Sequence, residues 1–250
     1  KQISCQYPFD KLCGCGVAFK LIQALIPSED FVIKSQDYLD ILAIATVADI
    51  VSLEEENRIF VKNGLKLMKN TNNLGVKALL EVCGLKGKKI NSGHIAYMIG
   101  PRINAAGRVG SAEIAVKLFT TNDPKEAKEL ALFLDEENRN RQQLEAQILD
   151  EALEMIEEEP RYQKEKVLVI YKEDWHHGII GIVASKIIDK YYKPTIILSI
   201  EDGIAKGSAR SISGFDLFKS LDQCKELFIK FGGHELAAGL SLNADNIEEF

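Results

Sequence analysis

Residues 167–200 read VLVIYKEDWHHGIIGIVASKIIDKYYKPTIILSI, and this stretch decides the fold. Val167–Tyr171 and Thr195–Ile200 are short apolar runs of the kind that form buried strands. Between them, Ile179–Tyr191 has the apolar spacing of an amphipathic helix. A strand, a helix and a strand in this order predict a βαβ unit of an α/β domain.

A long helix is predicted before this unit. Asp123 is a favoured N-cap, Pro124 suits the first helical position, and Glu126 stands where it can answer the cap. No helix breaker follows before Pro160, so about 36 residues extend on the order of 50 Å at the rise of an α-helix. The apolar stripe lapses across residues 135–143, which predicts a strut between two domains that is polar all round in its middle.

The first half of the chain is predicted to be mainly helical. Helix-like apolar patterns cover residues 14–25, 37–45, 54–68, 74–82, 92–99 and 111–119. Gly100–Gly110, with the sequence GPRINAAGRVG, is expected to be a break between two of these helices because it contains three glycines and a proline.

Gly100–Gly110 also has the composition of a phosphate-binding segment. Arg102, Asn104 and Arg108 provide hydrogen-bond donors on a small-residue backbone that can approach a ligand closely. An ordinary turn with solvated arginines fits the same residues. The segment alone leaves both interpretations open.

Asp49 is the one charged residue between Ile41 and Leu53. A carboxylate in such a run is costly to bury without a partner. It either caps the helix that opens near Glu54 or provides a ligand for a hard divalent cation. The residues themselves favour the cap.

Three polar clusters are predicted on loops of the α/β domain, where ligands generally bind. They are Trp175–Gly178, Lys206–Ser211 and Gly232–Gly239. Each also has a structural interpretation, as a capped helix start, a serine turn or a glycine hinge. Their candidate substrate-binding residues are His176, Ser208, Arg210, Gly232, Gly233 and His234.

The net charge of −6 does not exclude a nucleic-acid partner, because 12 acidic and 4 basic residues lie in 124–159 alone. The remaining chain has 25 acidic and 27 basic residues, a net of +2. The five cysteines are odd in number and scattered, which is typical of reduced thiols, and Cys13 and Cys15 have no second pair at zinc-site spacing. Without a long apolar run or a signal peptide, the protein is predicted to be cytoplasmic, with no membrane partner.

Seven stretches together resemble the RecJ family of single-strand-specific DNA exonucleases, in the DHH phosphoesterase superfamily. The most specific are GPRINAAGR at 100–108, WHHGIIGIVASK at 175–186 and GGHELAAG at 232–239; the others are 9–25, 46–53, 134–142 and 207–211. The resemblance implies a mainly helical C-terminal part of a DHH catalytic domain at 1–122, a long connecting helix at 123–159 and an α/β DHHA1 domain at 160–250. The substrate would lie between the two domains.

The same resemblance implies roles for individual residues. Asp49 matches a metal-binding aspartate of the family, which reverses the preference for a cap, and His176 is assigned a catalytic as well as a substrate-binding role. Ser208 and Arg210 match residues that grip the 5′ phosphate, joined by Arg108 or Arg102. The implied activity is a 5′-to-3′ exonuclease that uses two Mn²⁺ or Mg²⁺ ions in DNA repair and recombination, with a helicase and a single-strand-binding protein as partners.

The family pattern also includes an N-terminal aspartate pair, a further aspartate and an Asp-His-His motif, none of which is in this sequence. The chain is therefore expected to be a fragment that is inactive by itself. Two alternatives stay open: a DHH phosphodiesterase acting on short oligonucleotides or cyclic dinucleotides, and a non-catalytic DNA-binding replication scaffold.

Overall fold

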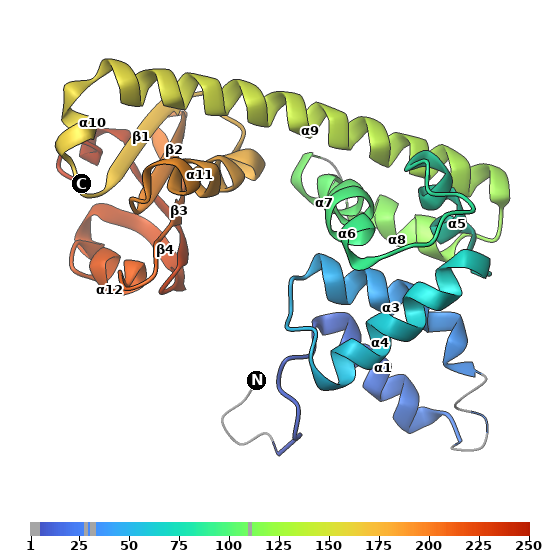
Figure 1. Ribbon diagram of the computed structural model, residues 1–250. Helices are drawn as coiled ribbons and strands as arrows, with labels where there is room; N and C mark the ends of the chain where they lie inside the picture. Colours follow the sequence, from blue (N-terminus) through green and yellow to red (C-terminus); the bar gives the residue numbers. More distant parts are fainter. Residues whose placement is uncertain (1–5, 28–29, 31–33, 110–111) are drawn as a thin grey trace. The chain divides into compact units, whose positions relative to one another are not determined.

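The computed structural model describes residues 6–27, 30, 34–109 and 112–250. They form two compact units, Lys1–Arg139 and Asn140–Phe250, called here the first and the second unit (Figure 1). The boundary falls within one long helix, α9 (Pro124–Glu158).

The first unit is helical, as predicted. Its core collects fully buried side chains that include Leu79, Ile95, Ile99 and Leu118. Besides the first part of α9, the α-helices of its described residues are α1 (Gly14–Leu25), α3 (Gln36–Ala48), α4 (Glu55–Leu67), α5 (Leu74–Val82), α6 (Ser92–His94), α7 (Gly100–Val109) and α8 (Ala112–Thr120).

The expected break at Gly100–Gly110 is wrong, because α7 covers residues 100–109; Gly110 itself lies outside the described residues. A π-helical turn, Ile95–Ile99, leads directly into α7. Pro101 is the second residue of α7, so the chain has no N–H there to donate back to the π-helical turn. Ala105 and Ala106 are fully buried, so packing of small side chains outweighs the low helix propensity of glycine and proline.

Helix α9 confirms the predicted long helix, but its start differs from the predicted capping box. The Asp123 carboxylate accepts a hydrogen bond from the Lys125 N–H at 2.9 Å, as an N-cap does. Glu126 instead accepts from the Thr121 hydroxyl and forms an ion pair with Lys117 at 2.6 Å. The long side chain of Glu126 turns to the end of α8 because a cation is available there.

The middle of α9 was expected to be a strut exposed to solvent on all sides. It is polar in sequence, but some of its polar side chains are buried. Asp135, Asn138 and Glu145 are all at most 6% exposed. Arg102 lies 2.8 Å from Asp135, and Lys186 lies 2.5 Å from Glu145. Each buried carboxylate is compensated by a cation that a helical-wheel pattern cannot show.

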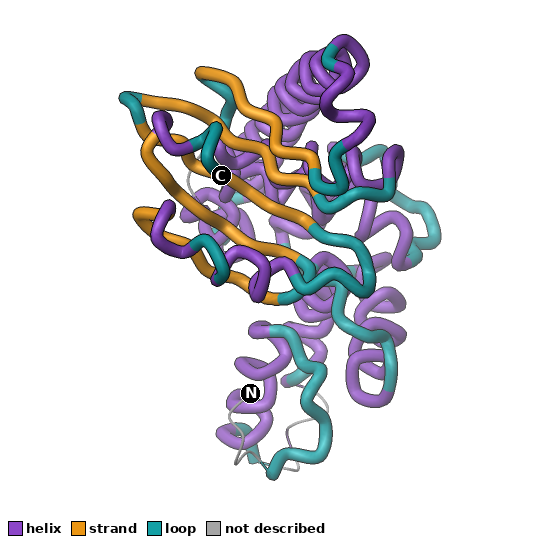
Figure 2. The backbone as a smooth tube through the Cα atoms, turned by 90° about the vertical axis from the view of Figure 1, so that its left-hand side faces the viewer, coloured by secondary structure: helices purple, strands orange, loops and turns teal. Residues whose placement is uncertain are grey.

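The second unit contains a sheet, whose strands are orange in Figure 2. It has five strands in the order β1-β2-β3-β5-β4. Strands β1 and β2 are parallel and the other pairs are antiparallel, so the predicted βαβ unit and the α/β class are confirmed. The elements are α10 (Pro160–Lys164), β1 (Leu168–Glu173), α11 (His177–Tyr191), β2 (Thr195–Glu201), β3 (Ile204–Arg210), α12 (Leu217–Asp222), β4 (Phe228–His234) and β5 (Ala237–Asn243).

Two of the predicted loop clusters are in fact strands. Lys206–Arg210 lies in β3, and Gly232–Gly239 forms the end of β4, a turn and the start of β5. Glycine, alanine and serine have low strand propensity, which hid these strands in the sequence. Packing requires small residues there: a Cβ on Gly207 would lie 2.4 Å from Cδ2 of Leu198.

Close packing of α3 against α4 depends on Gly64. A Cβ at this position would lie 2.2 Å from the Leu39 carbonyl oxygen and 2.5 Å from Cβ of Ala43. We expect Gly64→Ala to lower the free energy of unfolding by about 2 to 4 kcal/mol, since α3 and α4 must separate to admit the methyl group. Chemical denaturation of the purified protein measures this change.

Gly107→Ala is the matched control, because a Cβ at Gly107 meets nothing within 4 Å. Alanine in an open helical position is expected to raise stability by up to about 1 kcal/mol. Equal effects of the two substitutions would contradict the packing argument.

Candidate functional site

Ser208 and Arg210 lie on β3 against the N-terminal half of α11. A Cβ on Gly181 of α11 would lie 2.7 Å from the Ser208 hydroxyl and 3.0 Å from Nη2 of Arg210. Nη1 of Arg210 donates to the Ser208 hydroxyl at 3.1 Å and to the Ala209 carbonyl at 2.9 Å. Glycine at position 181 therefore allows a guanidinium and a hydroxyl to reach the backbone of the helix.

The start of α11 is capped by His176. Its Nδ1 accepts a hydrogen bond from the Gly178 N–H at 3.1 Å, and its carbonyl accepts from the Ile179 N–H at 2.9 Å. A neutral ring that accepts at Nδ1 carries its proton at Nε2, so the cap leaves the ring able to donate. The capping interpretation of His176 is thus correct, and it is compatible with contact to an anion near the positive end of the helix.

His234 and Gly232 of β4 continue the face of the sheet that carries Ser208 and Arg210. His234 pairs with Ala237, which pairs with Arg210; Gly232 pairs with Gly239, which pairs with Ser208. Directly paired residues of antiparallel strands lie on the same face. Gly232, His234 and Gly239 are exposed, so this part of the sheet offers a floor of small residues beside the guanidinium.

Gly233 points to the opposite face, and its role is in the backbone. A Cβ there would lie 2.3 Å from the Ala237 carbonyl oxygen, so only glycine allows the close approach of β4 and β5 at this end. The Nδ1 atom of His234 accepts from the Leu236 N–H at 3.3 Å and orders the turn that follows.

Trp175 anchors the loop that leads into α11. It is 4% exposed, and its indole N–H donates to Glu151 of α9 at 2.7 Å. This hydrogen bond, followed by those from Gln147 and Lys172, holds the pKa of the Glu151 carboxyl below its ordinary value. A charged acceptor inside the second unit therefore fixes the position of His176, the next residue along the chain.

In the first unit, Asp49 is an exposed residue at the C-cap of α3. It does not cap α4, whose N-cap residue is Glu54, so that interpretation is wrong. Ala48 packs against the start of α7, where a Cβ on Gly100 would lie 3.2 Å from the Ala48 methyl. Asp49 is thus the residue that comes directly after a tight contact between α3 and α7.

The two arginines of α7 have different surroundings. Arg102 donates from Nε to Asp135 at 2.8 Å and from Nη1 to the Met98 carbonyl at 2.6 Å, and its side chain is 17% exposed. Arg108 is exposed, one turn beyond the exposed Asn104. Residues four apart share a helix face, so Asn104 and Arg108 form a polar face while Arg102 connects α7 to α9.

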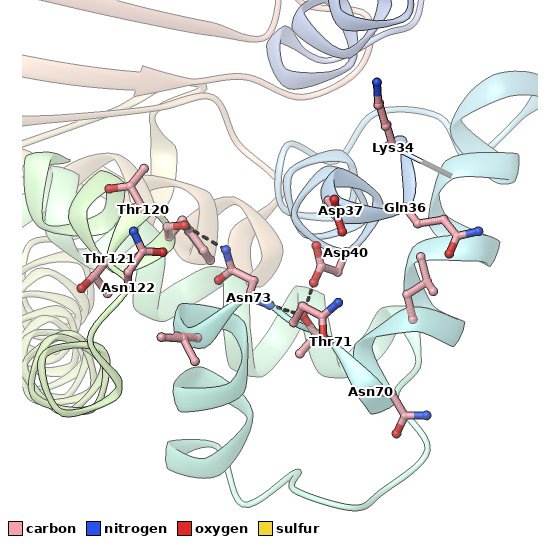
Figure 3. A pocket seen from close by; sticks show the side chains of 14 residues that line it. Lys34, Gln36, Asp37, Asp40, Asn70, Thr71, Asn73, Thr120, Thr121 and Asn122 are labelled. Atoms are coloured by element: carbon pink, nitrogen blue, oxygen red, sulfur yellow. Dashed lines mark hydrogen bonds between the residues drawn. The ribbon is translucent and has the colours of Figure 1, made fainter. Parts of the chain in front are cut away.

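A polar cavity of about 480 Å³ in the first unit is lined by Asp40, Thr71, Asn73 and Thr121, among others (Figure 3). Several of its polar groups form hydrogen bonds that stabilise the fold. Asn73 accepts from the Val76 N–H at 3.0 Å as the N-cap of α5 and donates to the Phe119 carbonyl at 2.8 Å. Thr71 donates to the buried Asp40. Capping of neighbouring helices explains why this cavity is polar.

A divalent cation would find only part of its ligand set here. Asp49 offers an exposed carboxylate, the oxygen donor that Mn²⁺ and Mg²⁺ prefer. Within the described residues, however, no three His, Cys, Asp or Glu side chains cluster as a metal site would require. Asp49 therefore fits as one ligand of a site that needs further groups.

The described residues include no helix that is long and apolar enough to cross a membrane. Four cysteines, Cys13, Cys15, Cys83 and Cys224, are free thiols, whereas Cys5 lies outside the described residues. Burial raises the pKa of the Cys15, Cys83 and Cys224 thiols, which keeps them protonated.

Comparisons with known proteins identify both units. Residues 164–250 match the family model of the DHHA1 domain. A single-stranded-DNA-specific exonuclease RecJ of Bacillus subtilis is 43% identical, over 100% of this chain and 31% of its own length. The chain therefore spans about a third of this relative.

Solved structures agree with the sequence relatives. A crystal structure of RecJ in complex with Mg²⁺ from Thermus thermophilus matches with a TM-score of 0.83 and 32% identity, over 96% of this chain and 37% of that chain. Exonuclease RecJ bound to manganese matches with a TM-score of 0.82 and 32% identity, over 98% of this chain and 60% of that chain. The fold of the described residues is thus that of the corresponding part of RecJ.

Sequence reasoning gave no individual role to Gly181, Glu151 or Asp135, and it placed Trp175 in a polar cluster without its anchoring role. A glycine within the strong helical pattern of Ile179–Tyr191 was a signal for Gly181, because such a glycine usually has a packing reason. The partners of Trp175 and Asp135 are distant in sequence and left no local signal.

The surroundings of the two arginines predict a large loss of stability on substitution of Arg102 and almost none on substitution of Arg108. Arg102→Ala is expected to lower the free energy of unfolding by about 3 kcal/mol, because it leaves Asp135 buried with only the exposed Arg139 as a cation. Arg108→Ala should change it by about 0.5 kcal/mol or less, as exposed substitutions usually do. Denaturant titration of both variants measures the difference; similar values would refute the division of roles.

Proposed function

Because the chain belongs to the RecJ family, we propose that the full-length protein is a single-stranded-DNA-specific exonuclease that hydrolyses phosphodiester bonds from the 5′ end. One observation carries this proposal: Ser208 and Arg210 lie against Gly181 beside the N-terminus of α11. Residues 1–122 would be the C-terminal part of a DHH catalytic domain, 123–159 the connecting helix and 160–250 the DHHA1 substrate-binding domain.

Ser208, Arg210 and the start of α11 form a suitable site for a terminal phosphate. A guanidinium binds phosphate with two parallel hydrogen bonds, and the helix start adds a partial positive charge. Serine donates a further hydrogen bond, and His176 can donate from Nε2. A phosphate monoester at a strand end has more charge than an internal phosphodiester, so the site would select the 5′ end.

The exposed residues near these groups would hold the strand. His234 and the backbone at Gly232 and Gly233 would contact the substrate on the open part of the sheet. Asn104 and Arg108 would do so from α7, whereas Arg102 would act by holding α7 in place.

Asp49 would hold divalent metal for the reaction together with ligands from the rest of the full-length protein. When bound, two Mn²⁺ or Mg²⁺ ions supply an activated water for attack on the phosphorus and stabilise the leaving oxygen. The residues of this chain then serve to bind and orient the strand, which raises the rate by fixing the reacting phosphodiester. DNA repair and recombination in the cytoplasm is the proposed setting, with a helicase and a single-strand-binding protein as partners.

The proposal predicts that the full-length protein, supplied with Mn²⁺, digests 5′-phosphorylated single-stranded DNA. Asp49→Ala should lower kcat by about 100-fold or more, because a metal ligand is lost while the exposed position tolerates alanine. Release of nucleotides from end-labelled DNA measures the rate. Undiminished activity of this variant, or equal digestion from the 3′ end, would refute the proposal.

A second prediction concerns recognition of the 5′ phosphate. In Arg210→Ala, the preference for 5′-phosphorylated over 5′-hydroxyl DNA should fall on the order of 10-fold to 100-fold, since charged hydrogen bonds contribute about 1.5 to 3 kcal/mol. The ratio of kcat/KM for the two substrates is the measurement.

Lys219→Ala is its control, because Lys219 is an 81%-exposed cation on α12 of the same unit. It removes the same charge and should keep the preference. An unchanged preference in Arg210→Ala would exclude end recognition by this residue.

A further inference from the structure

We propose that a groove in the first unit, formed by Lys69, Lys77, Lys86 and Lys128, binds phosphate groups of a DNA strand and so adds affinity outside the candidate site. The groove has a volume of about 400 Å³. None of the candidate site residues lines it. This inference rests on the proposed function, because it takes DNA to be the anion.

Four separate segments bring the lysines of this lysine groove together. Lys69 follows α4, Lys77 lies on α5, Lys86 lies in the turn after α5, and Lys128 lies near the start of α9. Segments distant in sequence therefore place four ammonium groups around one concave surface.

The lysines of the groove have little internal compensation. Lys86 lies 3.4 Å from Glu81, the one acidic residue that lines the groove. Within the described part of the chain, the ammonium groups of Lys69, Lys77 and Lys128 have neither a hydrogen bond nor a carboxylate partner. Some other exposed lysines of this unit are paired, such as Lys11 with Glu54 at 2.7 Å. Unpaired cations gathered in a concave surface attract an external anion.

The surrounding sequence strengthens the local field. Residues 66–89 contain six lysines and a single acidic residue, Glu81, a net of 6 − 1 = +5 in a chain whose total is −6. A basic concentration of this kind in an acidic protein is the electrostatic footprint of a polyanion site.

The polar cavity shown in Figure 3 adjoins the lysine groove and shares Asn70, Thr71 and Leu74 with it. The polar cavity is a structural surface, whereas the lysine groove has the groups of a binding surface. The polar groups of Thr71 and Asn73 on the cavity side already form hydrogen bonds, with Asp40 and within the cap of α5. The lysine ammonium groups on the groove side can still bind a ligand.

The four lysines, rather than the floor of the groove, provide the groups that would contact a ligand. Three side chains of the floor, Met68, Ala78 and Leu80, are at most 8% exposed. The lining includes no aromatic ring on which a base could stack. Contact would therefore be with phosphates and independent of base sequence, as lysine point charges allow.

The test is the salt dependence of DNA binding by the full-length protein, measured by fluorescence anisotropy on 3′-labelled oligo(dT) in EDTA. In a variant with Lys69→Gln, Lys77→Gln and Lys128→Gln, the slope of log K against log[NaCl] should shrink by roughly 0.7 for each lysine, about 2 in total. Between about 50 and 200 mM NaCl, the loss of affinity should thus be about 20-fold smaller than in the unmodified protein.

The control variant has Lys11→Gln, Lys34→Gln and Lys117→Gln, three exposed and ion-paired lysines of the same unit. It has the same net charge and should keep the original slope. Equal slopes in the groove variant and the unmodified protein, or an equal reduction in both variants, would overturn the proposal. Because EDTA removes cleavage from the assay, a reduced slope in a protein that cannot digest DNA would refute the exonuclease proposal alone.

Discussion

The buried ion pair between Arg102 and Asp135 is the interaction on which the first unit depends. Arg102 joins α7 to α9 and also donates to the carbonyl of Met98 in the π-helical turn. Since a buried charge without a partner is severely destabilising, neither helix can move away without exposing or isolating a charge. The exposed face with Asn104 and Arg108 is thereby fixed by an arginine of the same helix that is itself largely buried.

In the second unit, too, carboxylates of α9 hold another helix in place. Glu145 is buried between Arg141 and Lys186 of α11, and Glu151 accepts from the indole of Trp175. Both ends of the segment from Trp175 to Lys186 are thus tied to carboxylates of α9. Between these ties, the α11 backbone at Gly181 approaches Ser208 and Arg210, so the acidic helix positions a basic site without occupying it.

The class of fold could be predicted because apolar runs such as Val167–Tyr171 and the uninterrupted pattern after Pro124 are local signals. Strands β3 and β5 could not, since glycine and alanine have low strand propensity, and at Gly207 and Ala209 it is packing against neighbours that requires a small residue. The structure brings the candidate residues Ser208 and Arg210 within hydrogen-bond distance, while their binding role stays a prediction. Both residues were predicted to lie on a loop, whereas they lie on strand β3.

The overall acidity of the chain says little about an anionic substrate, because part of the acidic charge of α9 is already paired with cations. Glu126, Asp135, Glu145, Glu151 and Glu157 all pair with lysine or arginine side chains. Such pairs are nearly neutral beyond a Debye length of about 10 Å, so they contribute little to the distant field. The unpaired lysines of the lysine groove and the Arg210 guanidinium then dominate the potential close to their own surfaces, where a DNA phosphate would bind.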